Sequence, residues 1–169
     1  MSQDQHHYKT AEDSRPSSRP TRVPWPPLLL AGAIAGAIIL QELLPMNWPG
    51  LDDTPSRIVG LGIGLAGILL ISWAAYYLCR AGTTILPHKG ANTLVTGGPF
   101  TRFRNPIYLG DVMILLGTAE LTKNIWFVAA AAVFAIIVTF LAILPEEHHL
   151  AEKFGNEYKA YKARSRRWI

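Results

Sequence analysis

The chain has 169 residues, which is enough for one domain of ordinary size. Half of these residues are hydrophobic and the mean hydropathy is positive, a composition that argues against an ordinary soluble domain. The single cysteine, Cys79, excludes an intramolecular disulfide, and its place at the end of an apolar block predicts a buried small side chain.

Residues 1–24 are polar, rich in Ser, Pro and Arg, and contain no apolar period. This composition predicts a disordered tail. The apolar block that follows is longer than the core of a typical signal peptide, and no clear small-x-small cleavage site ends it. We therefore expect a retained helix at this position rather than a cleaved signal.

Four apolar blocks follow the tail, at about 25–44, 58–78, 107–121 and 125–144. Because a helix needs ~20 mostly apolar residues to cross a bilayer, each block is a candidate span, although the third is short and contains Asp111 near its start. Only Lys123 and Asn124 separate the last two blocks. This short connection predicts a tight helical hairpin.

The basic residues are distributed unevenly along the chain. A net charge of +4 is compatible with nucleic-acid binding or with basic cytoplasmic loops of a membrane protein. All 16 Lys and Arg residues except Arg57 and Lys123 lie in the tail, in the 80–106 loop or after the fourth block. The positive-inside rule then places both termini in the cytoplasm, so no nucleic-acid partner is needed to explain the charge. The short, cysteine-poor chain favours a bacterial cytoplasmic membrane.

The second block contains a glycine pattern, G-x-G-x-x-G, that runs from Gly62 to Gly67. After a strand this pattern would suggest a dinucleotide site, but here it lies inside an apolar block. Gly60 and Gly64 have the small-xxx-small spacing that lets membrane helices pack closely. We expect close helix packing, with a homodimer through this helix as one possible use.

Two polar segments flank the predicted hairpin, one at 94–110 and one at 146–150. In the first, Arg104, Asn105 and Pro106 stand at a helix start, where free N–H groups and the helix dipole favour an anion. In the second, Glu146 and Glu147 supply carboxylates suited to an organic cation. The alternative is that such residues simply lie in the headgroup layer or the aromatic belt.

A metal site is another use that the second segment could serve. His148 and His149 adjoin the glutamates, but the pattern lacks two histidines at i and i+4, and His88 is the one other histidine outside the tail. We therefore expect no metal site.

These segments resemble the isoprenylcysteine carboxyl methyltransferase and phospholipid methyltransferase superfamily, and the resemblance covers about residues 87–169. The matching residues are 94–100, 104–110, Glu146, Glu147, Phe154, Gly155, Tyr158, Tyr161, Arg167 and Trp168. The chain departs from the superfamily pattern at Asn105, where many relatives have His, and at Thr101, where relatives often have Arg. The amide of Asn105 cannot act as a general base.

The four apolar blocks predict an all-α, polytopic integral membrane protein with about four transmembrane helices, and the resemblance implies a cytoplasmic cofactor-binding loop and a C-terminal helix. The chain would divide into a tail (1–24), two N-terminal transmembrane helices (25–86) and a methyltransferase region (87–169). The implied cofactor is S-adenosylmethionine. The residues implied to bind it are His88, Leu94, Val95, Gly98, Phe100, Arg104, Asn105, Pro106, Tyr108 and Glu147, and those implied to act in catalysis are Arg104, Glu146 and Glu147.

The implied activity is methyl transfer to a membrane-embedded or lipid-like acceptor, similar to that of a protein-S-isoprenylcysteine O-methyltransferase. A phospholipid N-methyltransferase and a small-thiol S-methyltransferase remain alternatives within the same class. A membrane reductase of the sterol-reductase type is a more remote one, because this chain is much shorter and has no separate nucleotide signature. A non-catalytic membrane scaffold on the same fold would have no use for Arg104, Asn105, Tyr108 and the glutamate pair.

Overall fold

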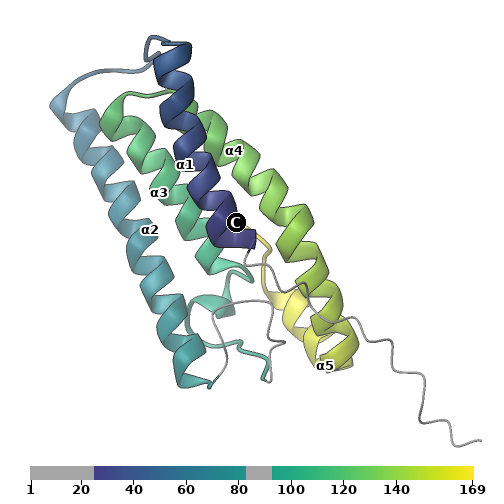
Figure 1. The fold of residues 1–169 in the computed structure, drawn as a ribbon. Coiled ribbons are helices and arrows are strands. Elements are labelled where there is room, and N and C mark those ends of the chain that lie inside the picture. The colour runs from purple at the N-terminus through teal and green to yellow at the C-terminus, as the bar shows by residue number, and fades with distance from the viewer. Residues whose placement is uncertain (1–24, 83–92) are drawn as a thin grey trace, which may run out of the picture.

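The computed structural model describes residues 25–82 and 93–169, and helices account for most of these two ranges. The elements in chain order (Figure 1) are α1 (Trp25–Leu43), α2 (Thr54–Arg80), the short 3-10 helix η2 (Gly98–Thr101), α3 (Pro106–Thr122), α4 (Trp126–Val138), the π-helical turn η3 (Thr139–Ile143) and α5 (Leu144–Arg164). The predicted all-α fold is therefore confirmed. The predicted tail and His88 lie outside the described residues.

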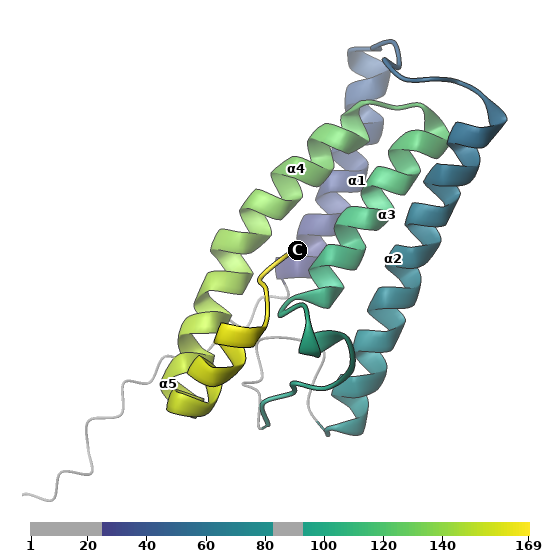
Figure 2. The same ribbon diagram turned by 180° about the vertical axis from the view of Figure 1, so that it is seen from behind.

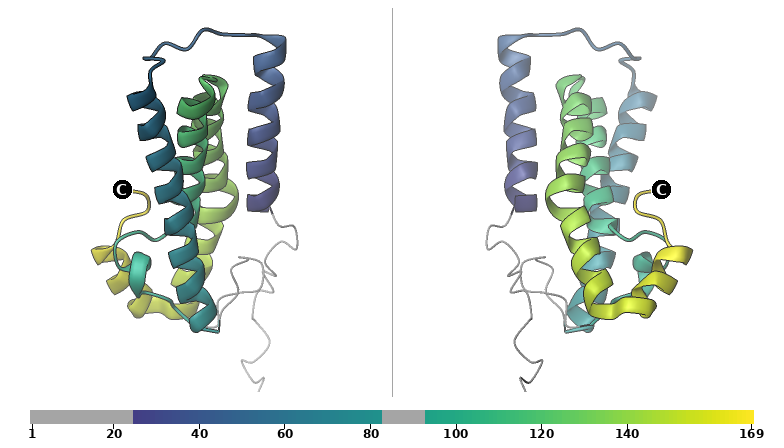
Figure 3. Two further views of the ribbon diagram at one scale, coloured as in Figure 1. Left: turned by 90° about the vertical axis from the view of Figure 1, so that its left-hand side faces the viewer. Right: turned by 90° about the vertical axis from the view of Figure 1, so that its right-hand side faces the viewer.

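The long helices form a bundle in which α3 and α4 are central. Helix α2 packs on α3, and α1 packs on α4, so α1 and α2 lie on opposite sides of the central pair (Figure 3). The core is formed where α1, α3 and α4 meet, around the fully buried side chains of Leu115, Phe134 and Val138. Many of the remaining apolar side chains point outward, as expected for helices that face lipid.

Three helices are long and apolar enough to cross a membrane: α1, α2 and the continuous helix that begins with α4. Helix α3 has 17 residues, which corresponds to about 26 Å and is shorter than a typical ~30 Å hydrocarbon core. The predicted helical hairpin is present, with α3 ending at Thr122 and α4 beginning at Trp126. The structure thus supports a membrane-spanning bundle, while the count of four spans stays a prediction.

Glycines allow α2 and α3 to approach closely. A Cβ atom on Gly117 would lie 2.6 Å from the carbonyl oxygen of Gly60, and one on Gly67 would lie 2.7 Å from that of Gly110. The predicted close packing is therefore present, and it joins α2 to α3 of the same chain. The predicted homodimer through α2 stays a prediction, and the Gly60 and Gly67 face is not available to it.

One prediction about α2 was wrong. Cys79 is exposed, although a buried side chain was expected. The reason is that α2 buries only the narrow face of Gly60, Gly67 and Ala74 against its neighbour. Cys79 lies off that face, so its apolar sequence context did not indicate burial against another helix.

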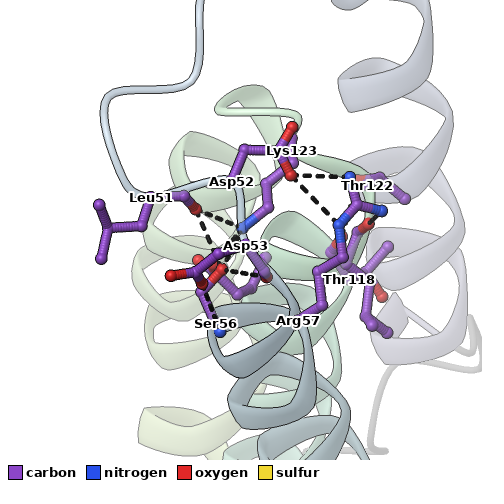
Figure 4. A network of polar contacts seen from close by, with 10 residues as sticks. Leu51, Asp52, Asp53, Ser56, Arg57, Thr118, Thr122 and Lys123 are labelled. Atoms are coloured by element: carbon purple, nitrogen blue, oxygen red, sulfur yellow. Dashed lines mark hydrogen bonds and ion pairs between the residues drawn. The ribbon is translucent and has the colours of Figure 1, made fainter.

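A polar cluster joins the connection before α2 to the turn between α3 and α4 (Figure 4). The Lys123 ammonium donates to the Leu51 carbonyl oxygen at 2.7 Å and to Ser56 Oγ at 2.8 Å, and it pairs with Glu120. Arg57 pairs with Asp52 at 2.8 Å in the same cluster. The two basic residues that the charge asymmetry assigned to the non-cytoplasmic side thus hold that end of the bundle together.

Helix α4 continues through η3 into α5 without a break. Pro145 cannot donate a hydrogen bond to the preceding turn, and its ring needs space there. The wider π turn of η3 directly precedes this proline and makes room for it. The apolar part of the helix ends at Leu144, so α5 continues as a polar helix outside the membrane-spanning segments.

A kink divides α5. Gly155 has φ +49° and ψ −116°, a left-handed conformation that other residues adopt at a cost of about 1–3 kcal/mol. The kink turns the second half of α5 and the C-terminal segment back toward the bundle (Figure 2). Tyr158 and Tyr161 therefore face the end where α2 finishes and α3 begins.

Candidate active site

A cavity of about 280 Å³ lies at the end of the bundle where α3 begins and α5 folds back. Its walls come from α1, the 93–105 segment, the first turns of α3, and the η3–α5 junction. The side chains that line it and carry polar groups are Thr93, Arg104, Asn105, Tyr108, Asp111, Glu146, Glu147, Tyr158 and Tyr161. The segments before and after the α3–α4 hairpin therefore meet at one site.

The loop before α3 is held by η2. Pro99 and Phe100 are buried, and the Thr101 hydroxyl donates to the Gly98 carbonyl oxygen at 2.7 Å. Gly98 has φ +58°, and a Cβ atom there would lie 2.5 Å from the ring of Tyr77. Gly98 therefore shapes the loop against α2 and does not line the cavity.

The C-terminal segment pairs with this loop. Phe103 and Arg166 form an isolated parallel bridge. Its backbone hydrogen bonds run from Arg104 N to Arg166 O at 2.7 Å and from Arg166 N to Arg102 O at 2.8 Å. The Asn105 side-chain amide also donates to the Arg167 carbonyl oxygen at 3.1 Å. The end of the chain thus closes one side of the site.

Glu147 is buried and lies at the centre of an ion-pair network. Arg104 Nε donates to Glu147 Oε1 at 3.2 Å, and Arg167 donates to the same carboxylate at 3.0 and 2.8 Å. Arg104 also donates to the Ser165 carbonyl oxygen at 2.6 Å. Burial opposes ionisation, but the hydrogen bonds and charges of the two arginines outweigh it and lower the pKa of Glu147. Glu147 is therefore an anion whose charge is already neutralised.

Glu146 and Asp111 differ from Glu147, because no cationic side chain in the described part of the chain pairs with either. Burial, together with the neighbouring Glu147 charge, raises the pKa of Glu146 to about 7. Asp111 is buried one turn after Tyr108 and lines the same cavity. Two carboxyl groups without a counter-ion therefore face the cavity, which favours a cationic ligand.

Two tyrosines from α5 complete the wall. The Tyr161 hydroxyl donates to the Phe100 carbonyl oxygen at 2.8 Å and so fixes the loop. The Tyr158 hydroxyl is buried without a hydrogen-bond partner among the described residues. Burial is the main cause that raises the pKa of each tyrosine to about 12, so both hydroxyls are neutral donors near pH 7. An unpaired buried hydroxyl costs about 1–3 kcal/mol, which a ligand acceptor would relieve.

The start of α3 also faces the cavity. Pro106 occupies the first turn and Asn105 is the N-cap residue, whose side-chain amide donates to the Arg167 carbonyl oxygen and makes no cap hydrogen bond. Because the first N–H groups of a helix have no intrahelical acceptor, those of Ile107 and Tyr108 are available to an anion. The cavity thus combines an anion-binding helix start with two unpaired carboxyl groups.

Most of the predicted site residues lie together in this cavity. Those that line it are Leu94, Val95, Phe100, Arg104, Asn105, Pro106, Tyr108, Glu146 and Glu147. Gly98 does not line it, and His88 lies outside the described residues. Within residues 25–82 and 93–169, no group of three His, Cys, Asp or Glu side chains is placed to hold a metal ion.

The residues with charged or phenolic side chains that lie in or beside the cavity without a predicted site role are Asp111, Tyr158, Tyr161 and Arg167. Asp111 could have been predicted from the sequence, since placing an acidic residue inside an apolar span costs free energy and usually marks a functional position. The two tyrosines and Arg167 belong to the matching pattern, but their contacts depend on the kink at Gly155. No local pattern predicts that return of the chain.

Two curated relatives are described as metal-resistance proteins. The chain is 26% identical over 118 residues to the nickel-cobalt-cadmium resistance protein NccN of Alcaligenes xylosoxydans xylosoxydans, and 28% identical over 123 residues to the cobalt-zinc-cadmium resistance protein CzcN of Cupriavidus metallidurans. These alignments cover 68% and 70% of this chain and 51% of each relative, so the chain spans about half the length of either protein.

An uncharacterized protein of Haemophilus influenzae is 33% identical over 63 residues, which is 37% of this chain and all of that protein. No solved structure matches the chain. Residues 55–157, more than half of the chain, match the family model described as phospholipid methyltransferase. This match agrees with the resemblance found in the sequence, and the chain therefore belongs to the phospholipid methyltransferase family.

Proposed function

We propose that the protein is an S-adenosylmethionine-dependent methyltransferase that methylates the amine of a lipid-like acceptor. Membership of the family supports methyl transfer to a membrane lipid or a similar acceptor. The pairing of charges in the cavity supports the proposed cofactor and the proposed amine acceptor. Arg104 and Arg167 are paired with Glu147, whereas Glu146 and Asp111 have no cationic partner among the described residues.

The residues present fit the cofactor. Its positively charged end suits the Glu146 carboxyl group, and its carboxylate suits the N–H groups at the start of α3 and the Tyr158 hydroxyl. Leu94, Val95 and Phe100 offer apolar surface for the adenosine part. When bound, the cofactor supplies a methyl group on a positively charged sulfur that leaves as a neutral thioether.

The chain's own residues would align the acceptor and remove its proton. Asp111 lies deeper in the bundle than Tyr108 and would attract the ammonium group of an acceptor that enters from the membrane. An ammonium group must lose a proton before its nitrogen can attack. Glu146, with a pKa of about 7, is suited to take that proton near neutral pH. Arg104 and Glu147 act in this proposal as positioning residues that hold the C-terminal wall.

The charge pairing favours an amine over the other acceptors. A carboxylate acceptor, as in an isoprenylcysteine methyltransferase, would need a free cation, and Glu147 engages both Arg104 in the cavity wall and Arg167 beside it. It would also approach two unpaired carboxyl groups, which costs electrostatic free energy. A neutral thiol acceptor would make no ion pair with Asp111. An amine is therefore the acceptor that would interact with the carboxyl groups of both Asp111 and Glu146.

The test is methyl transfer from labelled cofactor by detergent-purified protein to three amphiphiles with equal chains and amine, carboxyl or thiol heads. We expect the amine to be methylated, and we expect Asp111→Asn to raise the KM for it by about tenfold, because one charge-assisted contact is lost. Exposed Glu157 supplies the matched control, Glu157→Gln, which should leave the KM unchanged. Methylation of the carboxyl or thiol amphiphile in preference to the amine would refute the proposal.

A further inference from the structure

A second cavity, of about 490 Å³, lies in the other half of the bundle, away from the candidate active site. Helix α1 and helix α3 form its sides, and Phe127 of α4 contributes to it. Figure 3 shows that α1 and α2 lie on opposite sides of α3 and α4, and no residue of α2 lines this cavity. None of its residues lines the first cavity.

This second cavity is amphipathic along its length. The part nearer the middle of the bundle is lined by Ile34, Ile38 and Ile114. The part nearer the end of α1 is lined by Gln41 and Glu42, and by Thr118 and Thr122 on α3. An apolar part near mid-bundle with a polar part near the bundle end matches a lipid, whose chain lies inward and whose head lies outward.

The two threonine hydroxyls at this end offer only hydrogen-bond acceptors. The Thr118 hydroxyl donates to the Ile114 carbonyl oxygen at 2.8 Å, and the Thr122 hydroxyl donates to that of Thr118 at 2.7 Å. Each hydroxyl has therefore used its one hydrogen and keeps only acceptor capacity. The Asn124 amide is likewise engaged, by the Ala37 carbonyl oxygen at 3.2 Å and the Trp126 N–H at 2.9 Å.

Two further acceptors have no partner. Gln41 Oε1 is buried and makes no hydrogen bond with any described residue. The next residue, Glu42, adds a carboxylate, and none of the ion pairs in the described part of the chain includes it. These hydroxyl, amide and carboxylate oxygens, with the one negative charge of Glu42, are complementary to a head that donates hydrogen bonds and carries a positive charge.

We propose that this cavity binds a lipid with a primary ammonium head, in the leaflet opposite the active site. The ammonium group, with three N–H donors, would contact Gln41 and Glu42, and the chain would lie against Ile34, Ile38 and Ile114. This site is separate from methyl transfer and does not depend on the proposed function.

The test uses native mass spectrometry of the full chain, purified in detergent and mixed with equal amounts of phosphatidylethanolamine and phosphatidylcholine of the same chains. The second head is also cationic but has no N–H donor, so it isolates the hydrogen-bonding requirement. We expect the wild-type protein to retain phosphatidylethanolamine about tenfold better, and both Gln41→Leu and Glu42→Gln to remove most of this preference.

Two controls separate this site from the active site and from free amines. The comparison is repeated in the Asp111→Asn background, which removes the proposed ammonium contact of the first cavity. The preference that remains there should be lost with Gln41→Leu and with Glu42→Gln, and free ethanolamine should not displace the lipid if the chain contributes to binding. Equal retention of the two lipids by wild-type protein would overturn the proposal. So would a preference that Asp111→Asn removes and the Gln41 and Glu42 variants keep, or displacement by free ethanolamine.

Discussion

Glu146 and Glu147 are neighbours in the sequence, but their surroundings give them opposite properties. Glu147 contacts two arginines and stays ionised, whereas Glu146 has no cationic partner among the described residues and has a raised pKa. The pair was predictable as a pair of carboxylates at the membrane edge. Which of the two is neutralised could not be predicted, because Arg167 reaches Glu147 only after the chain turns at Gly155.

The raised pKa of Glu146 predicts a pH dependence. Below pH 7 most of the Glu146 carboxyl groups in the free protein are protonated, so they can neither attract a cation nor accept a proton. We therefore expect kcat/KM to rise with pH through about 7. Measured pH–rate profiles should lose this rise in Glu146→Gln and keep it in Glu157→Gln. If kcat/KM of Glu146→Gln still rose with pH and with the same midpoint, a group other than Glu146 would be responsible for the rise.

Tyr158 separates a ligand-binding role from a structural one. Its hydroxyl is buried and unpaired, so Tyr158→Phe removes an uncompensated polar group and should leave the ligand-free protein as stable as wild type, or more stable by up to about 1 kcal/mol. The same change should weaken cofactor binding by about tenfold. Thermal unfolding and calorimetric titration measure the two effects. A variant that loses stability and keeps full affinity would show that the hydroxyl is structural.

At the scale of the elements, α3 links packing to function. Its glycines contact α2 on one side, while its first turns present Tyr108 and Asp111 to the cavity. The bounds of the long helices were predictable from apolar blocks and prolines to within a few residues. The helix that packs against the α2 glycines was not predictable, because small-xxx-small spacing indicates a close contact but does not identify the neighbouring helix.

A matched pair of glycine substitutions tests this packing. Gly117→Ala would place a Cβ atom 2.6 Å from the Gly60 carbonyl oxygen, whereas a Cβ atom on Gly62 would meet no other atom within 4 Å. We expect Gly117→Ala to destabilise the protein by about 1–3 kcal/mol through overpacking, and Gly62→Ala to be neutral or stabilising by about 0.5–1 kcal/mol. Denaturation in detergent would measure both. Equal effects of the two substitutions would contradict the α2–α3 contact.

At the scale of the whole molecule, two ends of the bundle have different chemistry. One end holds the cavity, the helix start and the C-terminal wall, and the other is joined by the Lys123 and Arg57 cluster. Charge asymmetry along the sequence predicted this division, because basic residues concentrate on one side of the spans. The closure of the site by the C-terminal segment could not be predicted, since it depends on backbone pairing between residues far apart in the chain.

Calorimetric titration of S-adenosylmethionine into detergent-purified protein measures whether the cavity binds the cofactor. We predict saturable binding by the wild-type protein and by Glu157→Gln, with an affinity about tenfold or more lower in Glu146→Gln. Absence of binding by folded wild-type protein, with lipid present, would rule out cofactor binding at this cavity and leave a membrane scaffold on the same fold as the better explanation.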